Sequence, residues 1–377
     1  MALAEPSFTV GIEEEYLLVD RATRDLALDP PAGLFAECER RLGQQVKPEF
    51  LKCQVEVATG VCAKVSDARN ELRHLRRTVA EVAANFGLAP IAAGTHPFGR
   101  WQTQKHTDKE RYDLIARDLQ GVARRLIICG LHVHVGIEDE ELRIDLMNQA
   151  AYFLPHLLCL GASSPFWQGE DTGLKSFRLS IFGSLPRTGL PERFDSQGDY
   201  QRMIGRMVGA KLIDDPSKIW WDLRPSARFP TLEMRICDVP TEVEHSLAIA
   251  ALYQSVLGML FRLRKANQRW RIYPLTLLNE NRWRAQRYGL QGDLVDFGKG
   301  ELVPYAELLE ELIALTRADA ESFDCVTELD VCRRIVAEGN SADRQLRLHK
   351  EALARGASAQ EALYAVVDNL IARTAAS

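Results

Sequence analysis

The sequence predicts an α+β protein in which a single sheet has one apolar face and one polar face that carries the chemistry. Four segments far apart in the chain, 11–20, 51–59, 130–136 and 231–236, alternate apolar and polar residues with the period of two that is typical of strands. Elsewhere apolar residues recur at three- and four-residue steps, which indicates amphipathic helices. One alternating strand is common, but four with matching polar groups indicate one sheet with a packed back.

The first of these strands carries three adjacent acids. Alternation places Glu13 and Glu15 on one face and the apolar residues of the segment on the other. Two carboxylates about 5 Å apart repel by roughly 3 kcal/mol at an effective dielectric near 20, so we expect positive charge between them. A solvated acidic strand edge is the alternative. Glu14 falls on the apolar side, where we expect it to meet an arginine or a backbone donor.

The other three strands carry groups of the same kind. Glu49 and Glu56 bracket the strand at 51–59, seven residues apart, whereas His132 and His134 share one face of the third strand, and Glu233 and Arg235 one face of the fourth. Carboxylates with an imidazole suit Mg²⁺ or Mn²⁺, hard ions that also bind water and phosphate oxygens. The chain has neither a Walker A sequence nor G-x-G-x-x-G, so metals and arginines would have to hold the phosphates of any bound ATP.

Predicted helices fill the intervals between the strands. The clearest is 66–86, which Gly87 ends, and we expect its Arg73, Arg76 and Arg77 to form a solvated face.

A strand at 88–93 then leads into a loop that contains His96. A second amphipathic helix is predicted at 108–127.

The middle of the chain combines an apolar helix with a long loop. We expect a helix at 140–160 to kink at Pro155 and its His156 to be a core residue. Residues 161–200 are rich in Ser, Gly and Pro and predict a long ordered loop, to which Arg178 contributes a functional side chain.

The C-terminal part predicts more helices and no second domain. Thr241 and Glu244 are expected to cap a central apolar helix that ends near 263. Three or four amphipathic helices follow, and Ser358 with Glu361 is expected to cap the final one. No linker or change of composition separates them, so we expect a single domain, 1–377, whose helices at about 300–377 cover the outside of the sheet.

Composition argues against several classes of protein. The 377 residues carry a net charge of -5 with Arg and Glu interspersed, which argues against a nucleic-acid partner. Eight cysteines without C-x-x-C spacing fit a reducing cytoplasm. The N-terminus lacks the pattern of a signal peptide, and no uncharged apolar run of 18 residues occurs, so we expect neither secretion nor a membrane span.

Several motifs occur together in a fixed order. They are G-x-E-x-E at 11–15, G-T-H-P-F at 94–98, E-R-Y at 110–112, G-x-H-V-H-V-G at 130–136, W-D-L-R-P-S at 221–226, L-E-M-R at 232–235 and N-R-W at 281–283. The set resembles the glutamate–cysteine ligase type 2 family, whose members are carboxylate–amine ligases related to glutamine synthetase.

The resemblance implies a glutamine synthetase-like fold with a curved, mainly antiparallel sheet, a catalytic concave face and helices on the outer face. It implies ATP with Mg²⁺ or Mn²⁺, and the joining of L-glutamate to L-cysteine through a γ-glutamyl phosphate. The implied metal ligands are Glu13, Glu15, Glu49, Glu56, His132 and Glu233. The implied phosphate contacts are His134 and Arg224, and Arg235 would act beside Glu233 on the transferring phosphoryl group or the substrate carboxylate.

Other candidates have weaker support, and for each of them packing or a salt bridge is the open alternative. They are His96, Arg111, Tyr112, Arg178, Arg282, Arg287 and Tyr288. Of these, Arg178 is expected at the nucleotide and the others at the amino-acid substrates.

Two further classes of function stay open. His132, His134 and Glu233 could form the zinc site of a hydrolase, although the additional carboxylates favour several hard ions. A nucleotide-binding regulatory protein without turnover is the second. A serine hydrolase lacks support because no G-x-S-x-G is present. Another amine or acid substrate remains an alternative to cysteine and glutamate, and a homodimer is the common state of soluble oligomers.

Overall fold

The computed structural model describes residues 4–108 and 110–376, without the side chains of 111 and 114–116. A seven-stranded sheet forms its centre. Its order is β10 (Leu223–Pro225), β11 (Thr231–Met234), β5 (Leu131–Gly136), β1 (Val10–Asp20), β3 (Gln54–Ala58) and β2 (Val46–Pro48), and β4 (Leu88–Ile91) pairs with β1. All of these pairings are antiparallel, which confirms the expected sheet.

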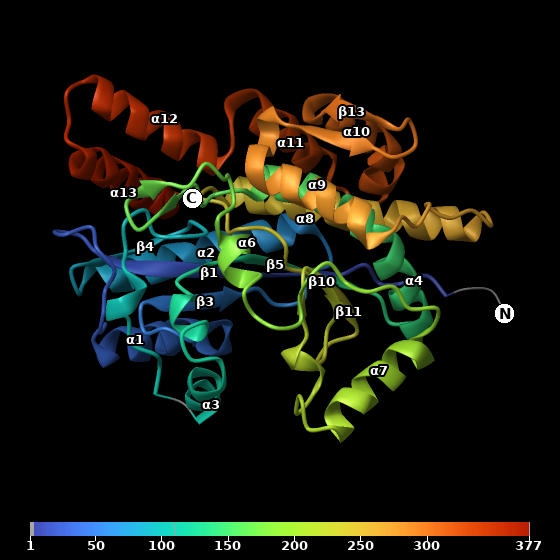
Figure 1. Ribbon diagram of the computed structural model, residues 1–377, viewed down its shortest axis with the longest axis horizontal. Helices are drawn as coiled ribbons and strands as arrows, with labels where there is room; N and C mark the ends of the chain where they lie inside the picture. Colours follow the sequence, from blue (N-terminus) through green and yellow to red (C-terminus); the bar gives the residue numbers. More distant parts are fainter. Residues whose placement is uncertain (1–3, 109, 377) are drawn as a thin grey trace.

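Helices and three small strand pairs surround this sheet (Figure 1). The helices are α1 (Ala32–Leu42), α2 (Val65–Ala84), α3 (Glu110–Leu119), α4 (Glu140–Ala150), α5 (Leu154–Gly161), α6 (Arg178–Phe182), α7 (Gln197–Gly209), α8 (Val243–Lys265), α9 (Leu275–Tyr288), α10 (Tyr305–Ser322), α11 (Val326–Glu338), α12 (Ser341–Ala354) and α13 (Ala359–Ala375). The small pairs are β6 (Phe166–Trp167) with β7 (Glu170–Asp171), β8 (Thr188–Gly189) with β9 (Trp220–Trp221), and β12 (Asp293–Asp296) with β13 (Glu301–Pro304).

The central strand β1 sets the register of the functional residues. β5 pairs with its first half, β3 with its middle and β4 with its end. Glu13 therefore lies opposite His132, and Glu15 opposite Glu56. Across β5, His134 lies opposite Glu233. Directly paired residues project from the same face, so these side chains share one side of the sheet, which we call the front face.

Two long helices cover the opposite, apolar back face. α2 contacts β1, β3 and β4, whereas α8 contacts β1 and β5. The α8 sequence is apolar almost throughout, and within residues 4–108 and 110–376 it is the one helix long and apolar enough to cross a membrane. Its side chains are instead packed inside the protein, between the sheet and the helices above it (Figure 1), as in a core helix.

The expectation of a solvated arginine face on α2 is wrong for Arg76. This side chain is fully buried, and its Nε and Nη2 donate to the two carboxylate oxygens of Glu14 at 2.7 Å each. Glu14 also accepts from the hydroxyls of Tyr16 and Ser246. The acid on the apolar side of β1 has therefore found an arginine, as expected, and a buried charge is stable only when it is paired in this way.

The C-terminal helices form an outer layer. α10 and α11 pack on α8, which lies between them and the sheet (Figure 1). α13 packs on β4 and α2, and the backbone N–H of Ala92 donates to Thr374 Oγ1 at 2.9 Å. Ser358 and Glu361 form the predicted capping box at the start of α13.

Two predicted helices are interrupted. The segment 108–127 contains α3, which ends before Gln120, whose φ of +47° is incompatible with a continuing helix, and a short 3-10 turn follows at 123–125. The apolar segment 140–160 breaks into α4 and α5 through a 3-10 turn at 151–153, and Pro155 stands in the first turn of α5, where its missing N–H leaves no helical bond unmade.

Two local predictions are wrong. Thr241 does not cap α8, because its hydroxyl donates to the carbonyl of Ala92 and Glu244 instead pairs with Arg69 and Arg73. The segment 161–200 is not one continuous loop, since it contains β6 to β8, α6 and the start of α7.

Candidate active site

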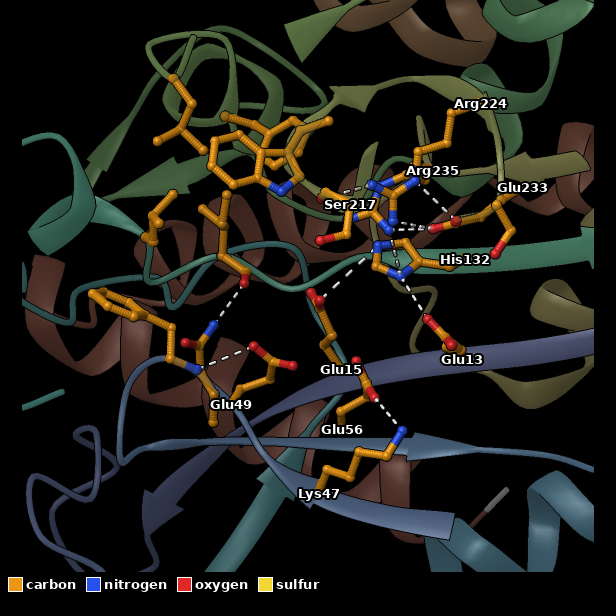
Figure 2. A pocket seen from close by; sticks show the side chains of 18 of the residues that line it. Glu13, Glu15, Lys47, Glu49, Glu56, His132, Ser217, Arg224, Glu233 and Arg235 are labelled. Atoms are coloured by element: carbon orange, nitrogen blue, oxygen red, sulfur yellow. Dashed lines mark hydrogen bonds and ion pairs between the residues drawn. The ribbon is translucent and has the colours of Figure 1, made fainter. Parts of the chain in front are cut away.

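The front face of the sheet lines a cavity of about 450 Å³. Most of the residues that the sequence singled out line this cavity, namely Glu13, Glu15, Glu49, Glu56, Tyr112, His132, His134, Arg178, Arg224, Glu233 and Arg235. Figure 2 shows two sides of it, one with Glu13, Glu233, Arg224 and Arg235, and the other with Glu49, Glu56 and Lys47.

The first ligand group consists of Glu13, His134 and Glu233. One ligand atom from each of these residues lies within 4.8 Å of the other two. The Nε2 atom of His134 is buried and makes no hydrogen bond, while its Nδ1 is 2.9 Å from Thr231 Oγ1. Burial opposes protonation of His134, but the neighbouring Glu13 and Glu233 outweigh it and raise its pKa. A metal ion would use this nitrogen and both acids.

The second ligand group consists of Glu15, Glu49 and Glu56, whose oxygens also lie within 4.8 Å of one another. Burial and the charge of Glu15 raise the pKa of Glu49 to about 7. Burial and three neighbouring acids raise the pKa of Glu56 well above its ordinary value. The nearest cation is Lys47 Nζ, 3.7 Å from Glu56. Three half-buried carboxylates with so little compensating charge suit a divalent cation.

His132 lies between the two groups. Its Nδ1 is 3.1 Å from Glu13 Oε2, and its Nε2 is 3.9 Å from Glu15 Oε1. It is His134, rather than the expected His132, that completes a group of three ligand atoms. Burial and the adjacent Arg235 lower the pKa of His132, which favours the neutral imidazole.

Two arginines hold Glu233 from either side. Arg224 makes a bidentate pair with it at 2.9 and 3.1 Å and donates to the carbonyls of Ser217 and Ile219. Arg235 Nη1 also donates to Glu233, while the buried Nε of Arg235 has no partner. Burial opposes the charge on Glu233, but Arg235 and Arg224 hold its pKa well below the ordinary value. The unpartnered Nε of Arg235 is a charged donor of the kind that binds phosphate oxygens.

A third arginine enters the cavity from α6. Arg178 is buried, and its guanidinium donates at 3.3 Å to the carbonyls of Arg235 and Ile236 and lies 4.0 Å from the carboxylate of the buried Asp238, while its Nε has no hydrogen-bond partner. It approaches Gly130 so closely that a Cβ there would lie 2.3 Å from Nη2. The N–H of Gly130 donates to Glu15 Oε2 at 2.6 Å. Gly130 therefore contacts both Arg178 and a member of the second ligand group.

Several weaker candidates lie elsewhere. Within the part of the chain that the structure describes, His96, Arg282, Arg287 and Tyr288 are not among the residues that line the cavity. His96 accepts from the N–H of Gly99 and holds its own loop. Arg282 pairs with the buried Asp222 at 2.6 Å.

Arg287 donates to the carbonyl of Gly173 and lies over the ring of Tyr288. Tyr112 does line the cavity. The side chain of Arg111 lies outside the described part of the structure.

The sequence of this chain matches that of a known protein family over nearly its full length. Residues 9–367 match the model of glutamate–cysteine ligase family 2. The chain belongs to this family. A relative from Rhodospirillum rubrum, named "Putative glutamate--cysteine ligase 2", is 59% identical over 99% of this chain and 97% of its own. A relative of the same name from Jannaschia sp. is 56% identical over 98% of this chain and 97% of its own.

Two solved structures have a fold similar to that of this chain. The glutamate–cysteine ligase of Francisella tularensis, in complex with AMP, has a TM-score of 0.70 at 12% identity and covers 100% of this chain and 91% of its own. A bifunctional glutathione synthetase from Pasteurella multocida has a TM-score of 0.69 at 15% identity and covers 97% of this chain and 52% of its own. The expected glutamine synthetase-like α+β fold is therefore confirmed.

The cavity is also lined by residues that the sequence did not single out. The apolar ones are Phe50, Leu119, Leu126, Ile128, Phe182, Leu185, Trp220 and Phe229, and the polar ones include Lys47, Gln54, Ser217 and Arg228. The polar residues of this set lie within a few positions of the motifs, so proximity could have suggested them. The apolar residues come from segments that carry no pattern beyond ordinary core packing, so no local signal distinguishes them.

Proposed function

We propose that this family member is an ATP-dependent ligase that joins the γ-carboxylate of L-glutamate to the amine of L-cysteine. The observation that carries the proposal is that two ligand groups face one cavity beside free arginine donors. Membership of the glutamate–cysteine ligase family supports the ligase chemistry. The AMP bound to the structurally similar Francisella protein supports a nucleotide site in this fold.

The two ligand groups fit Mg²⁺ or Mn²⁺. Both consist mainly of carboxylates, the oxygen donors that these hard ions prefer. The Nε2 of His134, which lies 3.6 Å from Glu13 Oε1 and makes no hydrogen bond, offers a nitrogen ligand to the first. When bound, such ions would offset the negative charge of ATP and of the acid that attacks it.

The reaction divides into two substitutions. The γ-carboxylate oxygen of glutamate bonds to the γ-phosphorus of ATP, and ADP leaves with the electrons of the broken P–O bond. The amine nitrogen then attacks the acyl carbon, inorganic phosphate leaves, and the nitrogen loses a proton to give the amide. In the first step two anions must meet, so the positive charge of the chain has to surround the point of attack.

The arginines are placed to do this. Arg224 and Arg235 would bind phosphate oxygens from the side of the first ligand group. Glu233 orients both of them through ion pairs, so its role combines metal binding with the positioning of the phosphate donors. Arg178, on the side of Glu15, would neutralise a carboxylate of the substrate or the transferring phosphoryl group.

The direct test is ADP release from ATP, Mg²⁺, L-glutamate and L-cysteine, with each component left out in turn. ADP that requires all of them together supports the ligase, and mass spectrometry of the product should show γ-glutamylcysteine. ATP binding by calorimetry without turnover over a broad set of acids and amines would favour the regulatory protein instead. One tightly held zinc per chain after native purification would favour the hydrolase.

Removing one acid from the first ligand group should abolish most of the activity. We expect Glu13→Ala and Glu233→Ala each to lower kcat by at least about 100-fold, because they remove preorganised charge at the phosphates. Glu351→Ala, on the solvent side of α12, is the control and should keep normal turnover. Near-normal turnover in both cavity variants would reject the assignment of the metal site.

A further inference from the structure

An acid that does not line the cavity pairs with Arg178. Asp238 lies in the segment after β11 and is fully buried, and its Oδ1 is 4.0 Å from Arg178 Nη1. Nη1 and Nη2 also donate at 3.3 Å to the carbonyls of Ile236 and Arg235, just before Asp238 in the chain. In the part of the chain that the structure describes, no second carboxylate pairs with Arg178. The orientation of this guanidinium therefore depends on the segment that ends at Asp238.

The same carboxylate also holds the main chain that carries Arg178. Asp238 Oδ2 accepts from the N–H of Ser163 at 2.9 Å and from the hydroxyl of Ser164 at 2.6 Å, and Oδ1 accepts from the hydroxyl of Ser176 at 2.7 Å. Ser164 Oγ in turn accepts from the backbone N–H of Arg178 at 3.0 Å, at the start of α6. Asp238 thus fixes Arg178 at two points, its guanidinium directly and its main chain through Ser164.

The G-T-H-P-F motif at 94–98 belongs to this network through its glycine. A Cβ at Gly94 would lie 2.6 Å from Asp238 Cγ and 2.8 Å from its Oδ2, so only glycine leaves room for the carboxylate. The N–H of Gly94 donates to Ser163 Oγ at 2.8 Å, and this hydroxyl donates to the carbonyl of Val239 at 2.8 Å. Gly94 does not line the cavity, so it affects the site through Asp238.

The buried charges of Asp238 and Arg178 depend on each other. Burial raises the pKa of Asp238, and Arg178 together with the donors from Ser164, Ser163 and Ser176 opposes this rise. A carboxylate without exposed surface is stable in its charged form only when a cation and hydrogen-bond donors surround it. Arg178 does line the cavity, and its Nε has no hydrogen-bond partner, so it keeps a donor for a ligand.

We propose that Asp238 is a positioning residue for the ligase reaction, which fixes the place where Arg178 presents its charge to the substrates. This rests on the proposed function, in which Arg178 neutralises a carboxylate of the substrate or the transferring phosphoryl group. Because one carboxylate holds Arg178 at two points, its loss should shift the arginine. A shift of about 1 Å near the reacting atoms can lower the rate by about 100-fold.

A double-mutant cycle tests whether Asp238 acts through Arg178. The readout is kcat/KM for L-glutamate, from ADP release at saturating ATP, Mg²⁺ and L-cysteine. We expect Asp238→Asn, which keeps the size of the side chain, to lower kcat/KM at least about tenfold, but less than about twofold when Arg178→Met is already present. Near-normal kcat/KM in Asp238→Asn, or an equal loss in both backgrounds, would overturn the inference while the ligase stands. No ADP from the unmodified protein would overturn the ligase and this inference together.

Asp319→Asn is the matched control for a loss of stability alone. Asp319 is also a buried acid, and it pairs with Arg262 at 2.8 Å without lining the cavity. We expect this variant to lower the melting temperature and to leave kcat/KM within about twofold. If it lowers kcat/KM as much as Asp238→Asn does, the effect of Asp238 comes from stability, and the inference is overturned.

Two serine variants keep the inference testable if Arg178→Met does not fold. Ser164→Ala removes the hydroxyl that joins Asp238 to the main chain of Arg178, and we expect kcat/KM to fall at least about fivefold. Ser255→Ala, at a buried serine of α8 that does not line the cavity, should stay within about twofold of the unmodified protein. Equal kcat/KM for the two serine variants would overturn the inference.

Discussion

The buried pair of Glu14 and Arg76 follows from the arrangement of the acids on β1. Three consecutive glutamates on a strand cannot all face one side, so projecting Glu13 and Glu15 into the cavity forces Glu14 into the back of the sheet. There it meets Arg76 of α2 in a site without exposed surface. Placing two acids in the cavity thus puts the charge of Glu14 in the apolar core behind the sheet, where Arg76 neutralises it.

Loss of Arg76 should destabilise the protein strongly. Arg76→Met leaves the Glu14 carboxylate buried and unpaired, and we expect the free energy of unfolding to fall by about 3–5 kcal/mol in urea titrations. Arg73→Met, one turn away on the exposed side of α2, should change it by less than about 1 kcal/mol. The double variant Glu14→Gln with Arg76→Met should recover part of the loss. If Arg76→Met lowers the free energy of unfolding no more than Arg73→Met does, the ion pair of Glu14 with Arg76 does not stabilise the protein.

Sequence periodicity could predict the polar residues of the site because it depends only on local geometry. Glu13, Glu15, His132 and His134 alternate with apolar neighbours, and any strand of that sequence presents them together. The partner of Glu14 could not be identified in the same way. Helix position alone makes Arg76 resemble its exposed neighbours, and its burial arises only when α2 packs on β1.

At the scale of elements, β1 organises the site because it pairs with three strands at once. A shift of one residue in its pairing with β5 would turn every side chain of the shifted strand to the opposite face. Glu13 and His132 would then no longer face each other, and the first ligand group would be lost. The close contact between Arg178 and the start of β5 fixes a further part of this geometry.

A methyl group at Gly130 should displace Arg178. In Gly130→Ala the new Cβ would overlap the guanidinium, so we expect kcat to fall at least about tenfold while the fold persists, at a cost of about 1–3 kcal/mol for overpacking. Gly205→Ala in α7 is the matched control, since its Cβ would meet nothing within 4 Å, and it should stabilise the helix slightly. Steady-state ADP release and thermal melts separate the two effects. Unchanged turnover in Gly130→Ala would exclude a role for Arg178.

The element boundaries show where local sequence rules reach their limit. α2, α8 and β5 lie close to their predicted positions because long periodic runs mark them. The interruption after α3 depends on a single residue with positive φ, and the division between α4 and α5 precedes the proline that was expected to cause it. The apolar residues of the cavity, among them Leu119, Phe182 and Trp220, were not predicted as site residues, because they come from α3, α6 and β9, which meet only in the folded chain.

At the scale of the whole molecule, the layered packing buries two histidines outside the cavity. His156 lies in α5 among aromatic rings, and its Nδ1 has no hydrogen-bond partner. Burial lowers the pKa of His156 to about 4 and that of His96 to about 4. His156 is thus the core histidine that the sequence predicted, and it is neutral in the folded protein at neutral pH.

These histidines should make the protein less stable in mild acid. The unfolded chain binds a proton below about pH 6.5, but the folded chain resists protonation until about pH 4, so stability falls as the pH drops through this window. We expect His156→Leu to flatten the pH dependence of the free energy of unfolding by up to about 3 kcal/mol between these limits. His74→Leu, at an exposed position of α2, should leave the slope unchanged. Parallel curves for His156→Leu and the unmodified protein would contradict the assignment.

The contact between α13 and β4 has a consequence for synthesis on the ribosome. The strand that includes Leu88 to Ile91 emerges from the ribosome long before the helix that covers it, in which Thr374 Oγ1 accepts from the N–H of Ala92. Until α13 has been synthesised, the apolar surface of β4 and α2 that it covers stays exposed, and chaperones would have to shield it. The packing around β4 is therefore complete only after residue 374 has been synthesised.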